Sequence, residues 1–87
     1  MRVKVRLFAR LRELADSAGW ECELPAGASI ADVWRAAVGR HPSLGPFGQS
    51  VSCALNADFA RMQAAVHDGD EVAFLPPVSG GGASARC

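Results

Sequence analysis

DGDEVAFLPPVSGGG, residues 68–82, is the stretch that decides how the rest of the chain can fold. Its opening DGD, residues 68–70, is a turn signal, and the apolar run at residues 71–75 has the length of one buried strand. The two prolines that follow cannot donate to a sheet ladder, and Pro77 biases Pro76 towards extended geometry. We therefore predict a final strand that ends abruptly and leaves the sheet in a stiff, directed way.

Three consecutive glycines, residues 80–82, follow that exit. One interpretation is a flexible linker or a frayed end, which the composition alone favours. The other is a narrow tip on a rigid root, because glycine has no Cβ and lets its backbone pass through a tight channel and approach a reacting atom. The residues by themselves leave both interpretations open.

Length and charge exclude several classes of protein. A chain of 87 residues has room for one modest core, so we expect a single domain. Nine basic residues balance nine acidic ones, which gives no overall electrostatic reason for binding nucleic acid or an anionic membrane. We expect neither as a partner.

The sequence also shows no feature of secretion, membrane insertion or metal binding. The segment after Met1 alternates charged and apolar residues and has no apolar signal-peptide core. The longest uncharged stretch, residues 44–57, is too polar to span a bilayer. The three cysteines have no CxxC spacing, so no zinc site is predicted. We expect a cytoplasmic protein that binds no metal or cofactor.

The first third of the chain predicts two strands around a short helix. Residues 2–8 alternate between apolar and basic side chains, which indicates a half-buried strand, with Phe8 on its polar face. Apolar residues then recur at helical spacing from Leu11, with a stop at Gly19. Residues 20–24 alternate again and are expected to pair with the first strand, because the link between them is short.

The middle of the chain carries the strongest helical pattern. Ser29 and Asp32 resemble a capping box, and the apolar stripe that begins at Ile30 ends at residues 39–42. Residues 43–50 are expected to form a loop. Residues 51–56 then predict a third strand, followed by a tight turn at Asn56 that puts strain on Ala57 if Ala57 also takes a positive φ.

A helix packed on mostly antiparallel strands, with the first and last strands parallel at the centre, is the β-grasp arrangement. The pattern of elements alone is also compatible with a ferredoxin-like fold.

Two motifs carry a resemblance to a known family. The run DGDEVAFLPPVSGG and the segment FARLRELA at residues 8–15 resemble the small subunit of molybdopterin synthase, a ubiquitin-like sulfur carrier. The resemblance covers residues 2–81. It implies an α+β, β-grasp fold in which a mixed sheet of about four to five strands packs on one main helix plus a short helix. It also implies assembly into a heterotetramer with two large subunits at the centre.

The resemblance implies a carrier without a catalytic site of its own. A ubiquitin-activating-like adenylyltransferase would use ATP to adenylate Gly81, which Gly80 precedes, and sulfur transfer would then give a thiocarboxylate. The large catalytic subunit would accept this sulfur for the dithiolene of molybdopterin, in molybdenum cofactor biosynthesis. Open alternatives are a thiocarboxylate carrier for another pathway (thiamine or cysteine) and a ubiquitin-like module that binds or is conjugated to other proteins.

The same resemblance suggests a docking surface beside the tail, made of apolar anchors with a charged rim. Its candidate residues are Phe8, Phe59, Phe74, Leu75, Pro76, Pro77, Val78 and Ser79, with Arg10 and Arg12 at the rim. Phe74 is equally compatible with a place in the core.

The chain departs from the family pattern after Gly81. Members of the family end at the second glycine, whereas GASARC, residues 82–87, follows here. We therefore divide the chain into a carrier domain, residues 1–81, and an extension, residues 82–87, that is expected to be flexible. With the extension attached, Gly81 has no carboxylate. The extension is removed by a processing protease, is foreign to the natural protein, or marks a chain whose carrier function is lost or altered.

Overall fold

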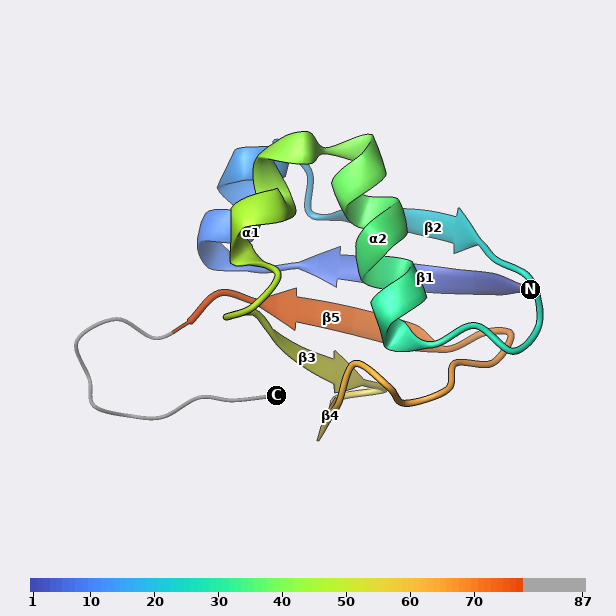
Figure 1. Ribbon diagram of the computed structural model, residues 1–87. Coiled ribbons are helices and arrows are strands. Elements are labelled where there is room, and N and C mark those ends of the chain that lie inside the picture. Colours follow the sequence, from blue (N-terminus) through green and yellow to red (C-terminus); the bar gives the residue numbers. More distant parts are fainter. Residues whose placement is uncertain (78–87) are drawn as a thin grey trace.

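The computed structural model describes residues 1–77, which form a five-stranded sheet with helices across one face (Figure 1). The strand order is β2-β1-β5-β3-β4, and the sheet is mixed. The elements are β1 (Arg2–Leu7), α1 (Ala9–Ala15), β2 (Gly19–Glu23), α2 (Ile30–Arg40), the 3-10 helix η1 (Pro42–Phe47), β3 (Ser52–Leu55), β4 (Asp58–Ala60) and β5 (Glu71–Leu75). This confirms the predicted β-grasp fold.

The first and last strands lie side by side at the centre of the sheet. β1 and β5 are parallel, and Leu7 is paired with Phe74. Along β1 the basic residues are exposed and the apolar ones are buried, as the alternation predicts. β2 runs antiparallel to β1 on the other side, with Val5 opposite Trp20. Both pairings of β1 agree with the sequence analysis.

Helix α2 supplies most of the helical side of the core. The backbone N–H of Ser29 donates to the Asp32 carboxylate at 2.9 Å, which is the predicted capping box. Val33 is fully buried, and the Trp34 ring lies edge-on to the Phe74 ring with 4.9 Å between their centroids. The helix therefore packs directly on the strand that leads into the tail.

Helix α1 ends earlier than the apolar spacing suggested. Asp16 takes the left-handed conformation, with φ 52°, and caps the helix, so the predicted stop at Gly19 was wrong. Gly19 instead begins β2, where a Cβ would lie 2.1 Å from the carbonyl oxygen of Val5. Gly19 is needed for the close approach of two strands and not for the end of a helix.

Part of the expected loop at residues 43–50 is ordered as η1. Pro42 stands at the first turn of this 3-10 helix, where its missing N–H costs nothing. The Leu44 side chain is fully buried in the core, and its backbone N–H donates to His41 O at 3.0 Å. A single apolar anchor therefore gives a proline- and glycine-rich segment a fixed shape that composition did not reveal.

A two-residue turn joins β3 to β4. Leu55 is paired with Asp58, so Asn56 and Ala57 form the turn, and their φ angles are 51° and 75°. Two positive φ angles characterise the type I′ hairpin turn, in which asparagine is favoured first and glycine second. The predicted strain at Ala57 is therefore present.

Replacing Ala57 with glycine should raise the free energy of unfolding by about 1 kcal/mol, because glycine has no Cβ to clash at positive φ. Urea denaturation measures the change. The matched control is Ala36→Gly inside α2, which should lower the free energy of unfolding by about 1 kcal/mol. A loss of stability from Ala57→Gly would contradict this turn geometry.

Candidate interaction surface beside the last strand

The start of β5 is held by a hydrogen-bond network. The Asn56 side chain accepts from the backbone N–H of Glu71 at 2.9 Å and donates to the Asp70 carboxylate at 3.0 Å. The backbone N–H of His67 donates to the same carboxylate at 2.8 Å. The hydrogen bond from the Asn56 side chain, followed by that from His67, lowers the pKa of Asp70 below its ordinary value. The root of the last strand is thus fixed by side chains as well as by its ladder.

The far end of β5 is where the predicted tail leaves the sheet. Leu75 is half-buried opposite Ser52, Pro76 is half-buried and Pro77 is exposed. The candidates Val78 and Ser79, and the glycines Gly80 and Gly81, lie outside the described residues. The structure therefore places residues 75–77, which form the root of the tail. The assignment of Gly81 stays a prediction.

The face of the sheet away from α2 combines small and apolar side chains. Ala73 is paired with Arg6 on one side and with Ala54 on the other, and Ala54 is paired with Phe59. Two alanines thus lie between the basic strand β1 and Phe59 on the edge strand β4. The Phe59 side chain is 74% exposed. Burying such an aromatic against a partner would remove much apolar surface from water.

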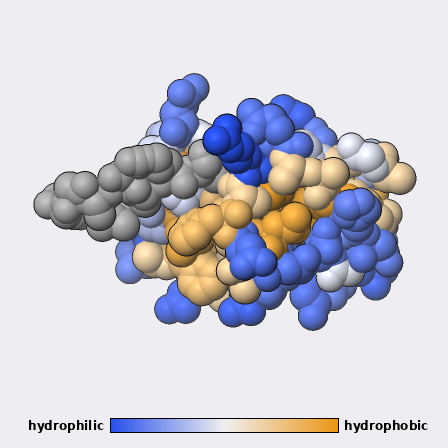
Figure 2. Space-filling model, turned by 90° about the horizontal axis from the view of Figure 1, so that it is seen from below, coloured by the Kyte–Doolittle hydropathy of each residue, from blue (hydrophilic) through white to orange (hydrophobic). Residues whose placement is uncertain are grey.

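Apolar side chains gather beside the edge strand. β4 is the lowest strand in Figure 1, and the view from below in Figure 2 shows an apolar region on this side, with hydrophilic side chains around it. An apolar centre with a polar rim is the usual composition of a protein interface. This side of the molecule therefore suits docking better than the charged end of the sheet does.

Phe8 lies at the end of β1 that faces the root of the tail. Its backbone N–H donates to Phe74 O at 3.2 Å, and its side chain is 39% exposed. The Arg6 guanidinium lies 5.7 Å from the centre of the Phe8 ring and 3.1 Å from the Glu71 carboxylate. Phe8 thus lies at the end of the sheet where β5 gives way to the two prolines.

The rim candidates lie on α1 and differ in their surroundings. Arg10 is 3.7 Å from the Glu13 carboxylate, whereas no ion pair of Arg12 is found among residues 1–77. Both residues are exposed. The structure brings Phe8, Leu75, Pro76 and Pro77 to one end of the central strand pair and leaves Phe59 apart on β4.

Phe74 does not belong to the docking surface. Its side chain is fully buried against Trp34, so no exposed area remains for a partner. The alternative of a core residue is therefore right, and the interface assignment was wrong. Along β5, burial alternates, and Phe74 shares the inward face with Val72. That two-residue period could have decided the question from the sequence.

Two further residues of this face, Ala54 and Ala73, were not predicted from the sequence. Neither has a chemically active side chain, and their role comes only from their register between Arg6 and Phe59. Aligning the outward positions of the two predicted strands, residues 51–56 and 71–75, would have placed these alanines side by side on the outer face.

Residues 1–77 contain no cluster of three or more histidine, cysteine, aspartate or glutamate side chains that could hold a metal ion. Within the same part of the chain, no helix has the length and apolar character needed to cross a membrane.

Three comparisons relate the chain to known proteins. The model of the ThiS family matches residues 5–81. The molybdopterin synthase sulfur carrier subunit of Chlamydomonas reinhardtii is 40% identical over 83 residues, which cover 93% of this chain and 100% of the relative. The crystal structure of SAMP1 from Haloferax volcanii has a TM-score of 0.83 and 32% identity, and the match covers 93% of this chain and 100% of that chain.

A further solved structure is a complex of two subunits. The protein–protein complex of subunits 1 and 2 of molybdopterin-converting factor from Helicobacter pylori contains a chain with a TM-score of 0.66 and 24% identity. The match covers 93% of this chain and 100% of that one.

Replacing Phe74 with alanine should lower the free energy of unfolding by about 3–5 kcal/mol, because it empties a fully buried site. Phe59→Ala is the matched control and should change that free energy by at most about 0.5 kcal/mol, since the side chain is exposed. Chemical denaturation monitored by circular dichroism compares the two variants. Equal effects would contradict the division between core and surface.

Proposed function

The chain belongs to the ThiS family, and from this premise we propose that it is a sulfur carrier that bears sulfur as a thiocarboxylate on Gly81. The observation that supports this most directly is that the family match runs from residue 5 to residue 81 and so ends at the second glycine of the tail. The similarity to molybdopterin synthase sulfur carrier subunits favours transfer of the sulfur to a precursor of molybdopterin. Carriage for another pathway, such as thiamine or cysteine synthesis, is the near alternative.

The chemistry follows from the poor reactivity of a carboxylate. The Gly81 carboxylate would attack the α-phosphorus of ATP and release pyrophosphate, which gives a mixed anhydride with AMP. A sulfur nucleophile would then form a C–S bond while the C–O bond to AMP breaks. When this nucleophile is hydrosulfide, AMP leaves with the electron pair of the C–O bond, and loss of the proton from sulfur gives the thiocarboxylate directly. The adenylyltransferase supplies the active site for these steps, so this chain needs no catalytic residue and no bound cofactor.

The extension requires a step before activation. Residues 82–87 hold the Gly81 carbonyl in a peptide bond, so the chain as written has no carboxylate at Gly81. A processing protease would add water across the Gly81–Gly82 bond and release the extension with a free amine. The carrier form is then residues 1–81. Because activation consumes ATP, we place it in the cytoplasm.

The large catalytic subunit of the synthase is the proposed partner. Support comes from the outward face, where Phe59 is the most exposed aromatic of the described residues, and from the end of the sheet where Phe8 and Leu75 lie beside the root of the tail. In this arrangement aromatic anchors supply affinity, and Arg10 and Arg12 supply orientation. The complex of subunits 1 and 2 from Helicobacter pylori has a chain of this fold, which agrees with such a pairing. A heterotetramer with two large subunits is the proposed assembly.

A second candidate function is that of a protein modifier. The small archaeal modifier protein 1 of Haloferax volcanii is 34% identical to this chain over 84 residues. In that case the activated Gly81 would be transferred to amines of other proteins. Covalent protein conjugates in cells would favour this function, and a pterin-dependent defect on deletion would favour sulfur carriage.

The direct test is the intact mass of a chain that ends at Gly81, after incubation with ATP, its activating enzyme and a sulfur donor. The expected change is the exchange of one oxygen for one sulfur. The matched control is the 87-residue chain, whose mass should stay constant because Gly81 has no carboxylate. If the processed chain also keeps its mass when all three components are active on a known carrier, the proposal fails.

Phe59→Ala should weaken binding to the large subunit by about tenfold or more, as expected for an exposed aromatic anchor. Isothermal titration calorimetry measures the affinity. The control is Arg35→Ala on α2, on the opposite face of the sheet, which should leave binding unchanged. Unaltered binding by Phe59→Ala would remove β4 from the interface.

A further inference from the structure

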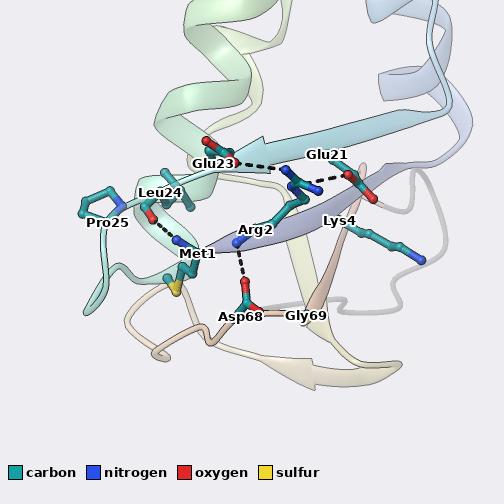
Figure 3. A pocket seen from close by; sticks show the side chains of 9 residues that line it. All are labelled: Met1, Arg2, Lys4, Glu21, Glu23, Leu24, Pro25, Asp68 and Gly69. Atoms are coloured by element: carbon teal, nitrogen blue, oxygen red, sulfur yellow. Dashed lines mark hydrogen bonds and ion pairs between the residues drawn. The ribbon is translucent and has the colours of Figure 1, made fainter.

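An open concavity of about 640 Å³ lies at the end of the sheet opposite the root of the tail. Its walls come from the first residues of β1, the outward residues of β2 and the turn at Asp68 and Gly69 (Figure 3). It contains Lys4, which is the only lysine of the whole sequence, and the α-amino group of Met1. The residues that carry these two amines therefore line one hollow.

Most charged groups of this concavity already have partners. The Met1 ammonium donates to Leu24 O at 2.8 Å. The backbone N–H of Arg2 donates to the Asp68 carboxylate at 2.7 Å. The Arg2 guanidinium lies 3.3 Å from the Glu23 carboxylate and 3.7 Å from that of Glu21 (Figure 3). These contacts hold the α-amine and neutralise the arginine.

Lys4 differs from these neighbours. Its side chain is exposed, and the ion pairs found among residues 1–77 do not include it. Figure 3 shows it extending away from Arg2 and from the Asp68 carboxylate. An amine reaches an acyl group only along an open path, and the Lys4 side chain is exposed whereas the Met1 amine is held against Leu24 O.

We propose that Lys4 is the acceptor for the activated Gly81 carboxyl of a second copy of this chain, which joins the two copies through an isopeptide bond. The proposal rests on the activation of Gly81 described under the proposed function. The deprotonated Lys4 amine attacks the carbonyl carbon of the glycyl adenylate and forms a C–N bond. The C–O bond to AMP breaks, AMP leaves with the electron pair, and the proton that nitrogen sheds passes to water. The substrate class is thus an acyl adenylate of a C-terminal glycine.

The fold favours a second copy over the chain's own tail. Lys4 is paired with Glu71 at the start of β5, whereas the tail leaves β5 at its other end, after Leu75. To reach its own Lys4 the tail would have to reverse directly after Pro76 and Pro77, which favour extended backbone. Because Lys4 and the residues from which the tail departs lie at opposite ends of the sheet, successive copies can be linked head to tail.

The test uses the 87-residue chain as acceptor, because its own Gly81 cannot act as donor. The donor probe is an N-acetylated peptide of residues 75–81, LPPVSGG, made as a C-terminal thioester, which is an electrophile of the same class as the adenylate. The expected product carries one peptide, mapped to Lys4 by tandem mass spectrometry. Lys4→Arg should abolish it.

The matched control moves the lysine to α1. The double variant Lys4→Arg, Arg12→Lys keeps the number of amines and presents the lysine on an exposed helix. If the concavity positions the thioester beside Lys4, this variant should react at least about tenfold more slowly. Equal rates for the two lysine positions, modification mainly at Met1, or no product at Lys4 would each overturn the proposal.

The result is independent of the sulfur-carrier assignment. The donor is supplied already activated, so a positive or negative outcome at Lys4 does not depend on adenylation or sulfur transfer. Conversely, Lys4→Arg in a chain ending at Gly81 should still gain the sulfur mass, since Lys4 plays no part in forming the thiocarboxylate. The two proposals can therefore fail separately.

Discussion

The hydrogen-bonded position of β5 between β1 and β3 is the constraint on which the rest of the structure depends. A strand with partners on both edges cannot shift its register without breaking two ladders at once. Its inward residues, Val72 and Phe74, are fixed against the helical layer, and its outward residue Ala73 is fixed between Arg6 and Ala54. Whatever follows Pro77 is therefore attached to the most constrained strand of the sheet.

The same arrangement divides the outer face of the sheet into two parts. On the side of β1 and β2, basic residues face acidic ones, as in the pairing of Lys4 with Glu21 and of Arg2 with Glu23. On the side of β3 and β4, the row continues through Ala54 to Phe59. Covering the charged part with a partner would remove water from charged groups, which costs free energy. Covering the apolar part is favourable, because it removes apolar surface from water. A partner for the tail is therefore best accommodated over β3 and β4.

Much of this fold could be predicted from the sequence, because the elements that depend on simple periodicity are also the ones that build the sheet. Residues 2–8 and the stripe that begins at Ile30 follow their expected periods closely. The missed features depend on contacts between distant residues. The order of η1 comes from the burial of Leu44, and the need for Gly19 comes from the nearby Val5 carbonyl. For the candidate site, the exposed aromatics Phe8 and Phe59 were foreseen, whereas the small residues beside them were not, since alanine has no chemical signature.

The parallel pairing of β1 with β5 also has a consequence for biosynthesis. The central ladder joins residues 4–7 to residues 71–74, so nearly the whole described chain must be available before the sheet can close. Contacts of such long sequence separation slow folding. During translation β1 is made long before β5. Until β5 is synthesised, the edge of β1 that β5 will occupy has no hydrogen-bonding partner. A partner that recognises the finished outer face would therefore bind only chains that extend at least through β5.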